Sequence, residues 1–565
     1  MKLGLKNQNI TGGKLIVETL NIENVTHVFG LIGSATMELF DALYDAKNIK
    51  FIDVRDERTG THMADGYARA SGKPGIIIAG QNGPGATNLV TGIAQAKAAF
   101  SPVISIAGAI ATEHEGKDAF QEIDQQSLFE PITKKTFTVR QTELISETLR
   151  EAFSLALSPR CGPVHINFPR DILANKINLN KITIHKKKII ESVNDKDLDN
   201  IITYINKSKQ PVIIAGGGIK NSLCHELVLK LSKYLNIPIV SSAGHGDAIP
   251  FNENLYAGQM GPRGNPIASQ LVKDADLILA LGTRLGFNST FFSYDNINKK
   301  AQIIQVDINK KSLGRYFPIS IGVCNDVKDV TNKLLFKVRE QKEIPSFKNW
   351  TKKFLLQKKN YLERREKNAD LHIKPIQPSG LFKILRDVLP ENSAVTLDAG
   401  TLCLQATDML NFSHPRTFFT PLDFGLVGFS YACGLGVKLA KPDYHVISLM
   451  GDGGFGMTVS ELSTAVQHKI NTITIVMNNK SWGAEKAYQR DFYEKRYIGA
   501  DISSPPFDKI AELYGAKGFH VDKLTNFKPI LERALNCNKP VVINVDVDPK
   551  ALYSFRKDSF KHKKK

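Results

Sequence analysis

Short runs of apolar, mostly β-branched residues recur along the 565-residue chain, and stretches with helical periodicity lie between them. Examples are "VTHVFGLIG", "GIIIAG", "PVIIAGGG", "HVISLMGDGG" and "TITIVMNN". A strand that is apolar on both faces is buried on both faces, which is typical of parallel sheets covered by helices. The pattern therefore predicts an α/β chain of mostly parallel sheets flanked by helices.

Two polar, lysine-rich stretches, at about 175–195 and 338–372, divide the chain into blocks of similar size. The length is also typical of about three domains. The blocks therefore predict an N-terminal domain at 1–180, a central domain at 190–340, a C-terminal domain at 372–550 and a basic tail at 551–565.

The first and third blocks share a plan, since each opens with an amphipathic helix, around 14–20 and 380–389. Glycine-rich loops then follow buried strands, and in open parallel sheets such loops line the ligand crevice. In the middle block, "IIAGGGIK" and "LALGTRLG" are also glycine turns. They indicate either a nucleotide site or tight turns between strand and helix.

The chain is basic, because Lys plus Arg outnumber Asp plus Glu by 74 to 56. The lysines are scattered and are not interleaved with aromatic residues, so we expect a solvated surface and no nucleic-acid partner. No run of eighteen apolar residues and no N-terminal signal peptide is found in the sequence, which argues against a membrane location. The six cysteines form no Cys-x-x-Cys pair, and a cytoplasmic enzyme is expected.

The stretch "MGDGGFGM" at 450–457 contains a Gly-x-Gly-x-x-Gly pattern, which by itself indicates a dinucleotide loop. That interpretation needs an acidic residue at the end of the next strand, but this strand ends in Asn478 and Asn479. Asp452 and Asn479 instead supply hard oxygen ligands, suited to Mg²⁺ or Ca²⁺. A cation between Asp452 and a diphosphate would remove their repulsion.

The paired motifs resemble the thiamin-diphosphate (ThDP) motif, Gly-Asp-Gly followed by Asn-Asn. The resemblance implies that Mg²⁺ is held by Asp452, the side chain of Asn479 and the backbone carbonyl of Ser481. It also implies that Val427 takes the position of the bulky residue that bends the cofactor. The cofactor contacts implied on this side are Gly400, Thr401, Val427, Gly451, Asp452, Gly453, Gly454 and Asn479.

The segment "VRDERTGTHMADGYARASG" resembles the catalytic-glutamate segment of ThDP enzymes and places Glu57 in the catalytic position. There Glu57 would hydrogen-bond the aminopyrimidine N1′ of the cofactor, and an apolar site would be needed to raise its pKa. The alternative is a solvated carboxylate at a helix start. His62, in the same segment, is either a proton shuttle or a structural histidine.

The resemblance covers essentially the whole chain and follows the order of the acetolactate synthase and decarboxylase group of ThDP enzymes. It implies a pyrimidine-binding domain, a central Rossmann-like domain and a diphosphate-binding domain. "GQNGPGATN" and "SWGAEKAYQRDFY" are most similar to sulfoacetaldehyde acetyltransferases, enzymes of taurine catabolism that convert sulfoacetaldehyde and phosphate to acetyl phosphate and sulfite. "GKDAFQEIDQ" is just as similar to acetolactate synthases, but the middle block lacks their downstream Asp-Arg, which argues against FAD.

A sulfonate or 2-oxo acid substrate and phosphate are anionic, so the site needs cationic or amide donors. The candidates around the substrate are Gln81, Asn82, Phe120, Gln121, Lys486, Arg490 and Arg556, with Gln121 also implied as catalytic. The charged candidates could equally be exposed helix or tail charges. Arg284 could contact a nucleotide or pair with a nearby carboxylate.

Three other functions stay open at this point. One is an acetolactate synthase-type carboligase acting on pyruvate, and another is a 2-hydroxyacyl-CoA lyase or oxalyl-CoA decarboxylase. The third is a cofactor-binding protein without catalysis, against which the intact Glu57, Asp452 and Asn479 argue. In the family, Glu57 and Asp452 would meet across a subunit interface, which implies a homodimer or homotetramer.

Overall fold

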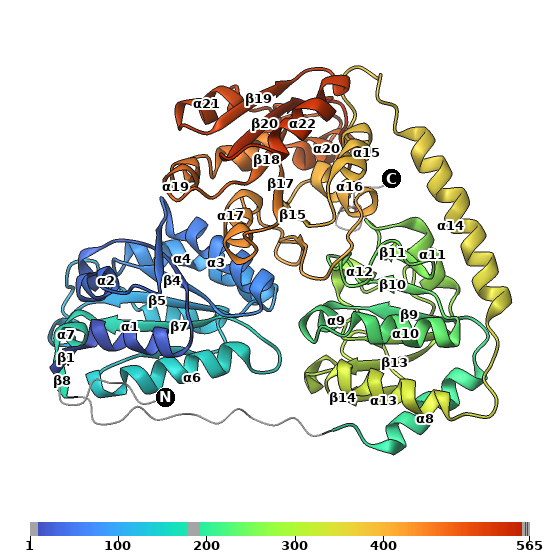
Figure 1. The fold of residues 1–565 in the computed structure, drawn as a ribbon, viewed down its shortest axis with the longest axis horizontal. Helices are drawn as coiled ribbons and strands as arrows, with labels where there is room; N and C mark the ends of the chain where they lie inside the picture. The colour runs from blue at the N-terminus through green and yellow to red at the C-terminus, as the bar shows by residue number, and fades with distance from the viewer. Residues whose placement is uncertain (1–8, 179–191, 556–559, 561, 563–565) are drawn as a thin grey trace.

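A computed structural model of the chain describes residues 9–178, 192–555, 560 and 562. It contains three six-stranded sheets in which all paired strands are parallel. Figure 1 shows the first sheet in blue, the central one in green and the third in orange to red, each flanked by helices. The predicted α/β fold with three mostly parallel sheets is therefore confirmed.

The first and third sheets have the same topology. Their orders are β3-β2-β4-β5-β7-β6 and β16-β15-β17-β18-β20-β19, and both read 2-1-3-4-6-5 when the strands are counted along the chain. The first sheet consists of β2 (His27–Leu31), β3 (Lys50–Asp53), β4 (Gly75–Ala79), β5 (Val103–Ala109), β6 (Thr136–Thr138) and β7 (Val164–Pro169). The third consists of β15 (Ser393–Leu397), β16 (Phe418–Phe419), β17 (His445–Gly451), β18 (Ile473–Asn478), β19 (Lys517–Val521) and β20 (Val541–Asp546).

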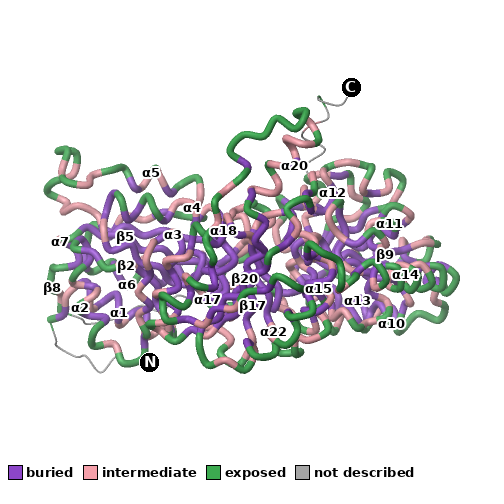
Figure 2. The backbone as a smooth tube through the Cα atoms, turned by 90° about the horizontal axis from the view of Figure 1, so that it is seen from above, coloured by how far each residue is buried: buried purple, intermediate pink, exposed green. Residues whose placement is uncertain are grey.

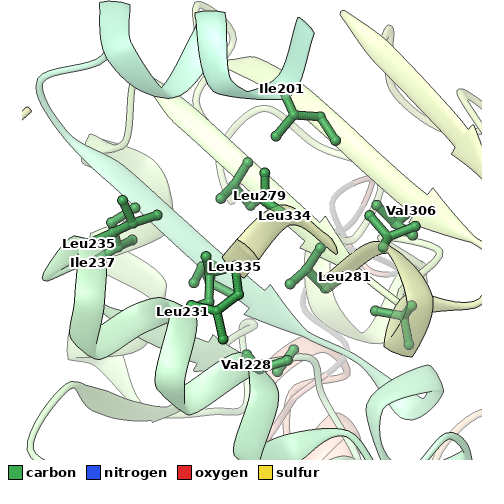
Figure 3. Close-up of a cluster of buried hydrophobic side chains, with 14 of the residues drawn as sticks. Ile201, Val228, Leu231, Leu235, Ile237, Leu279, Leu281, Val306, Leu334 and Leu335 are labelled. Atoms are coloured by element: carbon green, nitrogen blue, oxygen red, sulfur yellow. The ribbon is translucent and has the colours of Figure 1, made fainter. Parts of the chain in front are cut away.

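The central sheet has the order β11-β10-β9-β12-β13-β14, which is the doubly wound 3-2-1-4-5-6 order of Rossmann folds. Its strands are β9 (Pro211–Ala215), β10 (Ile239–Ser241), β11 (Tyr256–Gln259), β12 (Leu277–Leu281), β13 (Gln302–Asp307) and β14 (Ile321–Cys324). On one face, Leu279, Leu281 and Val306 form a buried cluster with Val228 and Leu334 of the covering helices (Figure 3).

Helices connect the parallel strands and cover the sheets. In the first domain they are α1 (Gly12–Ile22), α2 (Met37–Tyr44), α3 (Glu57–Ser71), α4 (Pro84–Ala98), α5 (Gln125–Phe129), α6 (Ile145–Leu157) and α7 (Arg170–Ala174). The central domain has α8 (Asp195–Lys207), α9 (Gly217–Asn221), α10 (His225–Leu235), α11 (Pro266–Asp274), α12 (Phe287–Thr290) and α13 (Val327–Arg339). The third has α15 (Pro378–Val388), α16 (Thr401–Met409), α17 (Ser430–Ala440), α18 (Asp452–Gly456), α19 (Glu461–Gln467), α20 (Gly483–Phe492), α21 (Phe507–Leu513) and α22 (Phe527–Leu535).

Two smaller features complete the fold. β1 (Asn9–Thr11) pairs antiparallel with β8 (Lys176–Asn178), which brings the two ends of the first domain together. In the described ranges, no helix combines the length and the apolar character that crossing a membrane requires. The cytoplasmic location stays a prediction.

The stretch 338–372, expected as a polar linker, is mostly a helix. α14 (Lys348–Asn368) runs along the outer side of the central domain and leads into the third domain (Figure 1). Its lysines, leucines, glutamates and arginines are good helix formers, and Trp350 and Phe354 anchor it in the core beneath. Residues 179–191 of the other linker lie outside the described residues, and the exact domain limits stay a prediction.

The first and third domains are joined where α3 crosses α17. A Cβ at Gly66 would lie 2.3 Å from the carbonyl oxygen of Cys433, and one at Gly436 only 1.9 Å from that of Met63. The two helices therefore approach backbone to backbone, and in Figure 2 this region belongs to the buried interior. The crossing fixes α3, which begins at Glu57, against the third domain of its own chain.

Candidate functional site

The residues expected around a metal and a diphosphate gather at the carboxyl edge of the third sheet. Gly400 follows β15, Asp452 follows β17, and Asn479 and Ser481 follow β18. These three strands are neighbours in the parallel sheet, so their carboxyl ends meet at one edge. The sequence prediction that these side chains come together agrees with this geometry, while their roles stay predictions.

Asp452 is the only carboxylate among the expected metal ligands, and its side chain is almost fully buried at 1% exposure. Its Oδ2 accepts a hydrogen bond from the Ser504 hydroxyl, and its Oδ1 lies 3.4 Å from the backbone N–H of Asn479. Burial raises the pKa of Asp452 above its usual range. A cation at this carboxylate would offset the cost of burying its charge.

The donor set suits Mg²⁺ on chemical grounds. Asp452 and Asn479 offer hard oxygens, and the buried Ser481 hydroxyl has no hydrogen-bond partner within the described part of the chain. Mg²⁺ usually takes few protein ligands and completes its shell with water and phosphate oxygens. A site with one carboxylate and one amide is therefore sufficient if a diphosphate supplies further ligands.

The glycines of this site fall into two pairs with different surroundings. A Cβ added at Gly400 or Gly451 would meet no atom within 4 Å, so these positions border open space beside the strand ends. A Cβ at Gly453 would lie 2.6 Å from the Trp482 ring, and one at Gly454 would lie 2.2 Å from the Asp398 carboxylate. Only the first pair is free for a phosphate to approach, and the second pair is required by packing.

Asp398 was not singled out in the sequence and holds the loop that carries Val427. Its carboxylate oxygens accept hydrogen bonds from the backbone N–H groups of Gly428, Phe429 and Ser430. The N–O distances are 3.0, 2.7 and 3.2 Å. Burial raises the pKa of Asp398 to about 6, although these bonds act in the opposite direction. The signal in the sequence was a carboxylate directly after a buried strand, as at Asp452.

Glu57 lies at the start of α3, at the carboxyl edge of the first sheet. Its side chain is 4% exposed, which contradicts the alternative of a solvated helix-start carboxylate. Asn88 donates a hydrogen bond to Oε2 at 3.0 Å, and a Cβ at Gly85 would lie 3.1 Å from Oε1. Burial raises the pKa of Glu57, while the bond from Asn88 opposes this shift. The burial that raises the pKa of an acid–base glutamate is therefore present.

The loop after β4 lies beside Glu57. It carries two of the expected substrate residues, Gln81 and Asn82, and contacts the turn that carries the other two. Asn82 donates from Nδ2 to the carbonyl oxygen of Gln121 at 3.0 Å and more weakly to that of Phe120, so its amide holds this turn. The half-buried Gln81 exchanges hydrogen bonds with the Ser34 hydroxyl at 3.3 to 3.4 Å. Phe120 is 86% exposed. Gln81, Asn82, Phe120 and Gln121 thus gather at one edge, and their roles stay predictions.

The charged candidates of the third domain have carboxylate neighbours. Lys486 forms an ion pair with Asp501, and Arg490 contacts Asp491 at 2.6 Å. Arg284 pairs with Asp423 of the third domain at 3.0 Å, which agrees with the second of its two interpretations. Substrate roles for Lys486 and Arg490 stay predictions, and Arg556 lies outside the described residues.

A clamp from the third domain holds the segment that carries Glu57. Oε1 of the buried Glu461 accepts the backbone N–H of Arg55 at 3.0 Å and the hydroxyl of Thr59. His468, at the end of α19, hydrogen-bonds Asp53. The residues on both sides of Glu57 are therefore bound to α19 of the same chain, a pairing between positions far apart in sequence.

His62 is buried in the interface between α3 and α17 and behaves as a structural residue. Its ring lies 5.5 Å from that of Phe429, centroid to centroid, and neither ring nitrogen has a hydrogen-bond partner among the described residues. Burial, and then the charge of Arg58, lower its pKa from 6.5 to about 3. His62 is thus neutral in the folded state, and the proton-shuttle interpretation loses support.

Acidification is therefore expected to destabilise the fold through His62. The unfolded histidine binds a proton near pH 6.5, whereas the folded one does so only near pH 3. The contribution of His62 to the free energy of unfolding is therefore fully present above pH 6.5 and falls by about 1.4 kcal/mol per pH unit below it. Denaturant unfolding at pH 7.5, 6.5 and 5.5 measures this slope. His165 and His245 are also buried with lowered pKa values, so His62→Gln is expected to reduce the slope by this amount and not to remove it, and the exposed His114→Gln is the control. Equal slopes for both variants would contradict the assignment.

Within the described part of one chain, Glu57 and the expected metal ligands are not bonded directly to one another, although Arg58 beside Glu57 donates to the carbonyl oxygen of Met457 at 3.1 Å. No hydrogen bond or ion pair in the described ranges joins Glu57 to Asp452, Asn479 or Ser481. Glu57 is bonded by Asn88 of the first domain, while Asp452 is bonded by Ser504 of the third.

Three family models match the chain, one within each of the three domains. They are the thiamine pyrophosphate enzyme N-terminal TPP binding domain at 10–128, the central domain at 198–334 and the C-terminal TPP binding domain at 398–545.

Curated relatives match nearly the full length. A probable acetolactate synthase large subunit of Methanocaldococcus jannaschii is 34% identical, over 95% of this chain and 92% of the relative. A sulfoacetaldehyde acetyltransferase of Castellaniella defragrans is also 34% identical, over 98% and 96%. The acetolactate synthase isozyme 3 large subunit of Escherichia coli is 30% identical, over 95% of both chains. Similarity alone does not separate the two activities.

Proposed function

The chain belongs to the thiamine pyrophosphate enzymes, and on that premise we propose that it is a ThDP- and Mg²⁺-dependent acetyltransferase. The proposed reaction converts sulfoacetaldehyde and phosphate into acetyl phosphate and sulfite.

The observation that carries the choice of substrate is the "QNGPG" loop beside Glu57. Acetolactate synthases more usually have Thr-Ser at the positions of Gln81 and Asn82. Among the described residues, Gln81 bonds only the Ser34 hydroxyl through its amide. Gln81 also lies close to Gly85, where an added Cβ would be 3.3 Å from Gln81 and 3.1 Å from Glu57 Oε1. A half-buried amide at this place could donate to a sulfonate oxygen. The sulfoacetaldehyde acetyltransferase relatives support the same choice.

On the third domain, Asp452, Asn479 and the Ser481 carbonyl would hold Mg²⁺, and Gly400 and Gly451 leave room for the diphosphate. The Val427 loop, fixed by Asp398, would contact the cofactor. On the first domain, Glu57 would exchange a proton with the aminopyrimidine, with Asn88 holding its carboxylate in place. When bound, ThDP would supply the carbon nucleophile for the aldehyde and the electron sink that lets sulfite leave.

We also propose that the chain is active as a homodimer or a homotetramer. Glu57 and Asp452 share no hydrogen bond within one chain, and the α3–α17 crossing and the Glu461 clamp hold the two domains in that arrangement. A second copy would therefore have to bring its diphosphate half to the Glu57 half of the first.

Release of sulfite that depends on phosphate is the expected result for the purified protein with ThDP and Mg²⁺. Sulfite is measured from sulfoacetaldehyde with and without phosphate, and acetolactate is measured separately from pyruvate. Acetolactate from pyruvate alone would overturn the acetyltransferase assignment. No product from either substrate would favour the CoA-linked lyases.

The second candidate is an acetolactate synthase-type carboligase, which the acetolactate synthase relatives favour at the same 34% identity. The expected absence of FAD is a further difference, since the middle domain lacks the Asp-Arg sequence that acetolactate synthases place against a flavin. Arg284, near that position, is paired with Asp423.

A further inference from the structure

A pocket lies between the first and third domains, on the side opposite the proposed ThDP site. Its volume is about 540 Å³, within the range of small-molecule sites. It is lined by the first residues of four strands, namely His27 of β2, Lys50 of β3, His445 of β17 and Ile473 of β18. The proposed ThDP ligands follow the other ends of these strands, and the seven residues of β17 span roughly 20 Å. The pocket is therefore distinct from the diphosphate site.

The lining of this pocket is strongly basic. Its basic side chains are His27, Lys50, Lys438, His445, His468, Lys469 and Lys539, and no Asp or Glu is among the lining residues. The floor between them is apolar, with Leu439, Pro442, Val446, Ile470, Ile473 and Leu535. The pocket thus offers several positive charges around a surface that could cover the body of a ligand.

Part of this charge has a structural explanation. The helices α17 and α19 end here, and cations are favoured at the negative ends of helix dipoles. Lys438 donates to the carbonyl oxygens of Pro442 and Tyr444 at 2.7 and 2.8 Å, and His468 pairs with Asp53. These two side chains are therefore accounted for by the fold.

The remaining charge is not offset. Lys50, Lys469 and Lys539 are exposed, and none of them forms an ion pair within the described ranges. Lys50 and Lys539 do not lie in or directly after a helix, so a helix dipole does not explain them. The side chain of Thr472, also in the lining, is buried, and its hydroxyl has no hydrogen-bond partner among the described residues. Unpaired ammonium groups around one cavity, with no carboxylate in its lining, are the chemistry that an anion would satisfy.

We propose that this pocket binds a phosphate-bearing polyanion, such as a nucleoside triphosphate or inorganic tripolyphosphate. Lysine ammonium groups bind phosphate oxygens as point charges, and three of them around one cavity match a ligand with several negative charges. A nucleoside would cover the apolar floor, while tripolyphosphate would use the charges alone. The site needs neither the acetyltransferase nor the carboligase activity.

The test is a calorimetric titration of the full-length protein, saturated with ThDP and with Mg²⁺ in excess, by ATP and by tripolyphosphate. The pocket variant combines Lys50→Gln, Lys469→Gln and Lys539→Gln. All three side chains are exposed, so the substitutions are expected to preserve the fold. The matched control changes Lys352, Lys353 and Lys367 of α14 to Gln, with the same loss of net charge. Saturating ThDP keeps the diphosphate site out of the measurement.

Saturable binding that the pocket variant weakens at least 10-fold, and the control less than 2-fold, is the expected result. ATP binding well above tripolyphosphate supports a nucleotide, and equal binding supports recognition of the phosphate chain. Absence of saturable binding of either compound, or equal loss in both variants, overturns the proposal. A pocket variant that changes only the oligomeric state would show that the basic face is a subunit contact, which also overturns it.

Discussion

Glu57→Gln is expected to lower turnover roughly 1000-fold, within the 10²- to 10⁴-fold range of general acid–base groups, while ThDP stays bound. The substitution keeps the size of the side chain and an acceptor for Asn88, but it removes the proton that the buried carboxyl can exchange. The proposed ligands of the diphosphate lie on the other domain, so affinity for the cofactor is expected to change little. Initial rates and calorimetric binding of ThDP measure the two effects separately.

Asp56→Asn is the matched control for this variant. Asp56 caps α3 by accepting the backbone N–H of Arg58 at 2.7 Å, and asparagine is an equally good N-cap residue. The control therefore loses the same charge one residue away, with activity expected within a few-fold of the original. If Glu57→Gln keeps near-normal turnover, or if both variants lose activity alike, Glu57 is not the catalytic glutamate.

The parts of the fold and site that could be predicted from the sequence are those that depend on residues close together in the chain. Buried strands followed by glycine loops gave the three parallel sheets, and the shared plan of the first and third blocks extends to an identical strand order. Asp452 and Asn479 were recognisable because each follows a buried strand. The long helix α14 was missed because its polar composition was interpreted as a linker.

The features that could not be predicted from the sequence depend on contacts between residues far apart in the chain. Glu461 binds the backbone at Arg55 across 406 positions, and no periodicity in the sequence indicates that pairing. Asn88 meets Glu57 only because the start of α4 packs on the start of α3. The glycines of the "GDGG" motif were all assigned to the diphosphate, yet the structure assigns Gly453 and Gly454 to packing against Trp482 and Asp398.

These contacts give the buried carboxylates of the site distinct tasks. Asp398 is surrounded by three backbone N–H groups and holds a loop, whereas Glu461 holds the segment of Glu57. Asp452 differs, because its partners are one hydroxyl and one long N–H contact. Of the three, it is the carboxylate with the most unused bonding capacity, which is what a metal ligand requires.

Asp452→Ala is accordingly expected to abolish detectable turnover and to weaken the joint binding of Mg²⁺ and ThDP by more than roughly 100-fold. Loss of even an outer-shell partner of a metal costs roughly 10- to 100-fold in affinity, and alanine removes the only anionic ligand proposed here. Ser504→Ala, which removes only the hydroxyl bonded to Asp452, is expected to have a smaller effect of a few-fold. Calorimetry with Mg²⁺ and ThDP together gives the affinities.

Two controls make this result specific. Asp522→Ala removes an exposed carboxylate of the same domain and is expected to leave affinity and turnover unchanged. Removal of divalent ions by EDTA is expected to inactivate the unaltered protein, with activity restored by added Mg²⁺, because the diphosphate would lose the cation that screens it from Asp452. Full cofactor affinity in Asp452→Ala, or activity that survives EDTA, would show that the carboxylate is not a metal ligand and that the space beside Gly451 is not the diphosphate site.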